Sequence, residues 1–159
     1  MQLSQWGIEK LIELEGLKLK QYKCSAGKDT IGVGHVITTP GYVTINGERI
    51  SVKDGITKGQ VIALLLEDII PREDCVNKKI TVPLTQNQFD ALVIFVFNIG
   101  CGEFTTSTLR RILNQGDYAG VPAQLKRWNK VDGKVNKGLV NRRNAEITMW
   151  SAPQEEFTT

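Results

Sequence analysis

The chain has 159 residues, of which 20 are basic and 17 are acidic, so its formal net charge is only +3. This length suits a single domain, which buries about 70% of the surface that its unfolded chain would expose. The positive charge is too weak to argue for a nucleic acid such as DNA as a partner, and it is compatible with an anionic polymer.

The N-terminal residues show no targeting segment. Residues 1–15 lack both the basic start and the apolar stretch of roughly 7–15 residues that a secretion signal requires. We therefore expect neither a signal peptide nor an N-terminal membrane anchor.

Residues 4–16 predict an amphipathic helix that ends in an acid. Ser4 is a good N-cap, and apolar residues recur at helical spacing: Ile8, Leu11 and Ile12. The next position on this face is Glu15, and Gly16 suits the end of the helix. A poorly solvated carboxyl group favours its neutral form, and a neutral acid can protonate the leaving oxygen of a sugar. Periodicity alone equally allows Glu15 to be a solvated residue at the helix end.

Short strands should follow this helix. Tyr22 and residues 30–36, with glycines suited to tight turns, predict strands of a first hairpin. Such a hairpin would carry Cys24 and Thr30 back toward the C-terminal end of the first helix.

A second hairpin is predicted at residues 43–50. Asn46 and Gly47 lie between two β-prone stretches, and this dipeptide is a strong signal for a type I′ turn. The first sixty residues or so should therefore form a small β-rich lobe.

The remainder of the chain predicts helices. Capping boxes open two of them: Thr57 with Gln60, and Thr85 with Gln88. Pro71 should kink or end the first of these, because proline cannot donate a backbone hydrogen bond. The second, at residues 89–98, is apolar but much shorter than the roughly 20 residues of a membrane span, which indicates a central core helix. Later helices are expected at three stretches: residues 109–113, 124–128 and 139–150.

The cysteines suggest a reducing compartment. There are three of them, an odd number, and their spacing does not match a metal site. Cys75 and Cys101 are expected to be buried free thiols, which behave as small apolar side chains.

The segment from Glu15 to His35 carries a specific pattern. Glu15 is followed after eight residues by Cys24, after five more by Thr30, and then directly by Ile-Gly-Val-Gly-His. This pattern resembles the active-site segment of the phage lysozymes, the endolysins of glycoside hydrolase family 24, which include the T-even phage enzyme. The family usually has Asp at the position of Cys24. The resemblance extends to several later stretches: residues 95–109, 113–117, 128 and 138–150.

The resemblance implies an α+β, lysozyme-like fold. A small β-rich N-terminal lobe and a larger helical C-terminal lobe would be joined by a long helix within one domain. The expected bounds are residues 15–56 for the β-rich lobe, 1–14 and 57–151 for the helical lobe, and 152–159 for a tail. The segment around residues 39–55 looks particular to this chain.

The resemblance also implies a muramidase. Such an enzyme hydrolyses the β-1,4 bond between N-acetylmuramic acid and N-acetylglucosamine of peptidoglycan, needs no cofactor or metal, and lyses the host cell. Glu15 would be the general acid, and Cys24 and Thr30 would complete the catalytic site, with Thr30 holding water. Asn98 and His35 are the expected substrate-binding residues.

The role of Cys24 stays open at this stage. An unperturbed thiol is only about 3% ionised at pH 7, and an ionised Glu15 nearby should lower that fraction further. Cys24 could be a nucleophile, a base for water, or a residue that positions water beside Thr30. Retention and inversion of the anomeric carbon are both possible.

Three other functions compete with hydrolysis. A lytic transglycosylase also uses one acid, but the filled second position and Thr30 argue against it. Cys24 and His35, the chain's single histidine, could form an amidase or peptidase dyad. The family, however, has a structural histidine at this position. A non-catalytic wall-binding module is the third alternative.

Other side chains have simpler expectations. Trp128 should belong to the core, and Arg142 and Arg143 should hold acidic partners. Asp29 should face away from Thr30, because successive strand residues point to opposite faces.

The resemblance finally implies a setting. The enzyme would accumulate as a monomer in the host cytoplasm and reach the periplasm and cell wall through holes made by a separate holin.

Overall fold

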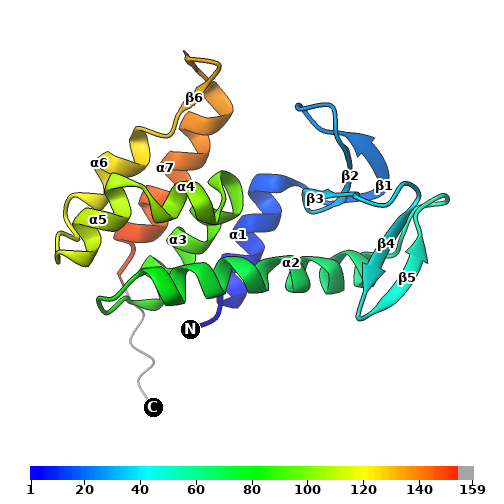
Figure 1. The fold of residues 1–159 in the computed structure, drawn as a ribbon, viewed down its shortest axis with the longest axis horizontal. Helices are drawn as coiled ribbons and strands as arrows, with labels where there is room; N and C mark the ends of the chain where they lie inside the picture. The colour runs from blue at the N-terminus through cyan, green and yellow to red at the C-terminus, as the bar shows by residue number, and fades with distance from the viewer. Residues whose placement is uncertain (154–159) are drawn as a thin grey trace. The chain divides into compact units, whose positions relative to one another are not determined.

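The computed structural model describes residues 1–153, which form a mixed α+β protein (Figure 1). They divide into two compact units, one of residues 9–70 and the other of residues 1–8 together with the chain from Pro71 onward. The expected α+β class is confirmed. The bounds given above for two lobes within one domain stay a prediction, and of the expected tail, residues 154–159 lie outside the described part of the chain.

The unit of residues 9–70 contains most of the first helix and two small antiparallel sheets. Its first elements are α1 (Gln5–Glu15), β1 (Lys18–Lys23), β2 (Asp29–Gly32) and β3 (His35–Val36). The three strands form one sheet in the order β1-β2-β3, so the first predicted hairpin is confirmed. Apolar residues from the first helix, from the sheet with its turn, and from the helix that begins at Lys58 make the core of this unit: Leu11, Ile31, Val33, Val61 and Leu64.

The second hairpin is also present, as β4 (Tyr42–Ile45) and β5 (Glu48–Ser51). Asn46 and Gly47 both have positive φ, at 51° and 77°, as a type I′ turn requires. Residues of β4 alternate between buried and exposed: Val43 and Ile45 are buried, whereas Tyr42 and Thr44 are exposed.

Helix α2 (Lys58–Lys79) begins with the predicted capping box. The Thr57 hydroxyl accepts from the Gln60 N–H at 3.1 Å, and the Gln60 side chain accepts from the Thr57 N–H at 2.9 Å. The helix continues through Pro71, so the possibility that Pro71 would end it is wrong. Buried apolar residues on both sides, such as Ile69 and Val76, offset the lost backbone hydrogen bond.

The other unit is built from five further helices and one short hairpin. The helices are α3 (Gln86–Ile99), α4 (Cys101–Thr105), α5 (Thr108–Asn114), α6 (Val121–Lys126) and α7 (Lys137–Ser151). Helix α3 starts with the predicted Thr85 capping box, has eight consecutive buried residues at 89–96, and packs against α7. It is therefore the central helix of this core, as expected. Among the described residues, no helix combines the length and apolarity needed to cross a membrane.

The later helices are confirmed with shifted ends. One short hairpin and one short helix were not predicted. Helix α6 starts and stops earlier than the predicted residues 124–128. The strands β6 (Lys130–Val131) and β7 (Lys134–Val135) form a hairpin whose turn residues, Asp132 and Gly133, both have positive φ. Asp-Gly is a hairpin signal, so this element could have been predicted. The five-residue helix α4 is too short to show a helical period.

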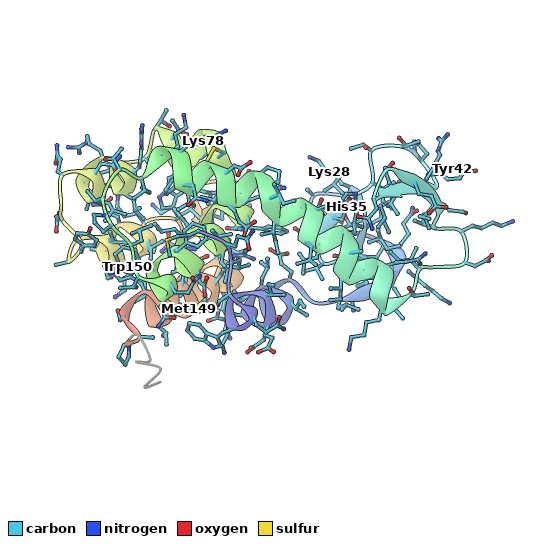
Figure 2. All side chains as sticks on the ribbon, turned by 90° about the horizontal axis from the view of Figure 1, so that it is seen from below. Lys28, His35, Tyr42, Lys78, Met149 and Trp150 are labelled. Carbon is cyan, nitrogen blue, oxygen red and sulfur yellow. A yellow bond between two sulfur atoms is a disulfide. The ribbon has the colours of Figure 1, made fainter. Side chains whose placement is uncertain are left out.

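Cys75 and Cys101 form a disulfide, so the expectation that both are free thiols is wrong (Figure 2). They are 26 residues apart in sequence, on α2 and at the start of α4, yet their Cα atoms lie 5.9 Å apart. This distance falls in the range that a disulfide requires, and only the packing of the two helices creates it. The cysteine content therefore gives no support for a reducing compartment.

Candidate active site

Glu15 is the last residue of α1 and belongs to the unit of residues 9–70. Gly16 ends the helix with a φ of +77°, and its N–H donates to the Ile12 carbonyl at 2.7 Å. Glycine adopts this left-handed conformation without steric cost. Glu15 is half-buried, so the helix end presents a carboxyl group that is partly shielded from water.

The turn between β1 and β2 brings Cys24 next to Thr30. The Cys24 N–H donates to the Lys28 carbonyl at 3.0 Å. The Thr30 hydroxyl, on a residue only 2% exposed, donates to the same carbonyl at 2.9 Å. The Thr30 side chain also lies near the half-buried Cys24 thiol and contributes to lowering its pKa. The pairing of these two residues in one turn agrees with the hairpin expected from the sequence.

Hydrogen bonds lower the pKa of the Cys24 thiol. The largest cause is the backbone of Lys28, followed by the Thr30 side chain and the backbone of Ala26. Each of these bonds stabilises the thiolate. The net effect is therefore opposite to the lowered thiolate fraction expected from a nearby ionised Glu15, because local hydrogen bonds determine the direction.

Tyr22 lies close to both Glu15 and the turn that holds Cys24. It is half-buried in β1 and lies opposite Thr30 in the β1–β2 pair. The pKa of its phenol is raised first by burial, and then by the negative charges of Glu15 and Cys24. Charges act on a neighbour in this way only at short range, because solvent and salt screen them. The sequence predicts a strand at Tyr22 but not this position, which depends on the register of the β1–β2 pair.

His35 and Asp29 have partners of their own. Nδ1 of His35, which Figure 2 labels, lies 2.7 Å from Oδ2 of Asp68 on α2, and both side chains are half-buried. Asp29 Oδ1 lies 2.6 Å from Lys23 Nζ. His35 thus connects β3 to α2 within the unit, and its contact with a substrate stays a prediction.

Asn98 belongs to the other unit, at the exposed end of α3. Its Oδ1 accepts from Nη2 of Arg143 at 2.7 Å, and Nη1 of Arg143 donates to the Trp128 carbonyl at 3.3 Å. The Trp128 ring packs edge-on against buried Phe95 with centroids 5.8 Å apart, but Trp128 itself is only half-buried, so it lies at the edge of the core and not within it. Arg143 therefore fixes the orientation of the Asn98 amide, whose contact with a substrate also stays a prediction.

Arg143 belongs to a buried cluster of charged side chains. Glu146 is 0% exposed, and its Oε1 lies 2.8 Å from Nε of Arg143. Nε of Arg142 lies 3.5 Å from the other carboxylate oxygen. Burial raises the pKa of Glu146 to about 7, against the opposing effect of the guanidinium groups of Arg143 and Arg142. Both arginines thus hold an acidic partner, as expected.

The residues around Tyr22 combine three chemical groups. A carboxylic acid can donate a proton to a leaving group, and a thiolate can accept a proton from water or attack carbon. A hydroxyl can both donate and accept hydrogen bonds, which suits it to hold water. This set matches the acid and the water-handling side that cleavage of a glycosidic bond requires.

Comparisons with known proteins agree with this geometry. The family described as "Phage lysozyme" matches residues 12–146. An endolysin of Acyrthosiphon pisum secondary endosymbiont phage 1 is 42% identical over 156 residues, which cover 96% of this chain and 99% of that protein.

Solved structures give the same result. The endolysin from Escherichia coli O157:H7 phage FAHEc1 has a TM-score of 0.82 at 37% identity, over 95% of this chain and 94% of that chain. The muramidase domain of SpmX from Asticaccaulis excentricus has a TM-score of 0.80 at 31% identity, over 96% and 99%. The expected lysozyme-like fold is confirmed.

Proposed function

The chain belongs to the phage lysozyme family, and from this we propose that it hydrolyses the β-1,4 bond between N-acetylmuramic acid and N-acetylglucosamine. Family membership makes it a lysozyme-type glycoside hydrolase that degrades peptidoglycan; the bond that it cuts is the finer proposal. The observation that carries the proposal is the grouping of Glu15, Cys24 and Thr30 around Tyr22.

In this proposal Glu15 is the general acid. Its carboxyl group is half-buried at the end of α1 and donates a proton to the glycosidic oxygen as the bond to the anomeric carbon breaks. The leaving sugar departs as an alcohol, and positive charge develops on the ring that remains.

Cys24 and Thr30 handle the water. The thiolate of Cys24 accepts a proton from a water molecule, and the Thr30 hydroxyl holds that water for addition to the anomeric carbon. The lowered pKa of Cys24 supports this assignment, because more thiolate is present at neutral pH than an ordinary thiol provides. Attack from the face opposite the leaving group would invert the anomeric carbon. Retention would instead indicate a covalent thioglycoside on Cys24.

Other residues and partners complete the proposal. Asn98, held by Arg143, and His35, held by Asp68, contact the glycan. The enzyme acts on peptidoglycan as a monomer. It starts in the host cytoplasm and reaches the cell wall with the help of a holin.

Mass spectrometry of fragments from purified peptidoglycan tests this function. We expect fragments that have gained one water and that end in a reducing N-acetylmuramic acid. Anhydro ends would identify a transglycosylase instead. Intact glycan strands with cut peptides would identify an amidase or peptidase, with Cys24 and His35 as its catalytic residues.

A further inference from the structure

An open pocket of about 830 Å³ lies in the unit of residues 9–70, and none of the proposed catalytic residues lines it. One wall is the middle of β1, and the other is formed by the start of β4 with the end of β5 and the turn that follows it. The polar side chains of its lining are Lys20, Gln21, Tyr42, Ser51, Lys53 and Asp54.

An irregularity in β1 forms the first wall. Lys18 pairs with Gly32 and Tyr22 pairs with Thr30, so three residues of β1 lie opposite one residue of β2. In a regular strand, successive side chains point to opposite faces. The extra residues of this bulge allow both Lys20 and Gln21 to line the pocket, and bulges commonly redirect side chains in this way.

Backbone contacts fix the second wall against β1. The N–H of Ile56 donates to the Leu19 carbonyl at 2.8 Å, and the N–H of Val52 donates to the Gly41 carbonyl at 3.0 Å. Gly55 has a φ of +86°, and a Cβ added there would lie 2.9 Å from the Leu19 carbonyl oxygen. The close approach of this turn to β1 therefore requires glycine, and the pocket is a defined part of the fold.

The lining combines an aromatic ring with polar and basic groups. Tyr42 is 41% exposed, and the guanidinium carbon of Arg49 lies 4.3 Å from its ring centroid, which restrains the ring. Tyr42 and Ser51 are directly opposite each other in the β4–β5 pair, on the face away from buried Val43. Figure 2 labels Tyr42 at this hairpin.

These groups suit a sugar that carries a negative charge. An aromatic ring offers an apolar surface to the C–H face of a sugar ring, and hydroxyl and amide side chains hydrogen-bond sugar hydroxyls. Ammonium groups such as those of Lys20 and Lys53 bind the carboxylates of a ligand. Asp54 is the single acid of the lining, so the lining carries a net positive charge.

We propose that this pocket is a second binding site for the cell-wall polymer, which takes a sugar unit together with the carboxylates of its stem peptide. The inference rests on peptidoglycan as the substrate, but it is independent of the roles of Glu15 and Cys24. A second site on the same chain would keep the enzyme on the polymer between cuts, because rebinding becomes intramolecular.

A pelleting assay with insoluble, purified peptidoglycan tests the inference. All proteins carry Glu15→Gln so that the polymer stays intact. We expect Lys20→Gln/Lys53→Gln to weaken binding about fivefold at low salt, and Tyr42→Ala to weaken it by a similar factor. The matched control is Lys10→Gln/Lys58→Gln, which removes the same charge from the same unit outside the pocket and should bind like the parent. Equal binding by the parent and both pocket variants, or equal loss in the control, would overturn the inference.

A second arm examines the ligand chemistry. On insoluble chitin, a β-1,4-linked polymer of N-acetylglucosamine without carboxylates, the effect of Lys20→Gln/Lys53→Gln should disappear while that of Tyr42→Ala remains. A persistent effect of the lysine substitutions would refute the carboxylate part of the inference. Because pelleting needs no catalysis, failure here is distinguishable from failure of the proposed function, which would show as absent hydrolysis by the unmodified enzyme.

Discussion

At the scale of single residues, Cys24 is the most unusual feature of the site. It occupies the position at which the phage lysozyme family usually has Asp, and its surroundings compensate in part for that exchange. Hydrogen bonds from the Lys28 backbone and from Thr30 lower the pKa of its thiol. A group that is ionised more readily can accept a proton from water at neutral pH, as a carboxylate would.

The ionisation of Cys24 can be measured by the pH dependence of its alkylation. The other two cysteines form a disulfide, so Cys24 is the single free thiol of the chain. We expect a midpoint below the ordinary value of about 8.5. Thr30→Ala should move it upward, because the Thr30 side chain contributes to lowering the pKa of the thiol. A midpoint above 8.5 in the unmodified protein would contradict the description of the turn.

Substitution of Cys24 separates catalysis from packing. Cys24→Ala should lower kcat by about 100- to 10,000-fold, because the group that activates water is absent. Cys24→Asp should keep substantial activity, since it restores the residue usual in the family. Release of reducing ends from peptidoglycan measures both variants, and full activity of Cys24→Ala would show that Cys24 is dispensable.

At the scale of the elements, the disulfide joins α2 to the start of α4. It closes a loop between residues 26 apart, and closure of a loop of this size contributes about 3.5 kcal/mol by restricting the unfolded chain. Cys75→Ser/Cys101→Ser should therefore lower the free energy of unfolding in urea by about that amount, whereas Cys24→Ser should not. Three titratable thiols in the unmodified, non-reduced protein would contradict the pairing.

Glu146, which is buried on α7, makes the stability of the helical unit depend on pH. Its pKa is about 7 in the folded protein against an ordinary value of 4.5, so the folded state binds more protons between these values. This group's contribution to stability is fully present below pH 4.5 and is lost as the pH rises through about 7, with a change of up to about 3 kcal/mol.

Thermal unfolding between pH 4.5 and 8 measures this dependence. Glu146→Gln should flatten the fall in Tm across that range, whereas Glu13→Gln, at a side chain 70% exposed, should leave it unchanged. A Tm that falls equally in the wild type and in Glu146→Gln would exclude Glu146 as its origin.

At the scale of the whole molecule, local sequence signals predicted the helices and strands. The contacts between residues that are distant in sequence could not be predicted from these signals. The capping boxes at Thr57 and Thr85 and the Asn46-Gly47 turn act over four residues or fewer, so the sequence displays them directly. The disulfide depends on helix packing, and the passage of α2 through Pro71 depends on buried residues on both sides. Neither is visible in a short stretch of sequence.

In the candidate site, too, the sequence predicted some features and the fold determines the others. Glu15, Cys24 and Thr30 could be named because their spacing forms a pattern, whereas the position of Tyr22 between them depends on strand register. The lowered pKa of Cys24 depends on the backbone conformation of its turn, which residue types alone do not define. The pocket beside β1 depends on a bulge that no sequence signal indicated.

Hydrolysis with Glu15 as the general acid is tested by the mass of peptidoglycan fragments formed in ¹⁸O-labelled water by the wild type and by Glu15→Gln. We expect the wild type to place one ¹⁸O at a reducing N-acetylmuramic acid and Glu15→Gln to release almost none of this product. Anhydro ends from the wild type, or labelled product from Glu15→Gln at the wild-type rate, would contradict this expectation.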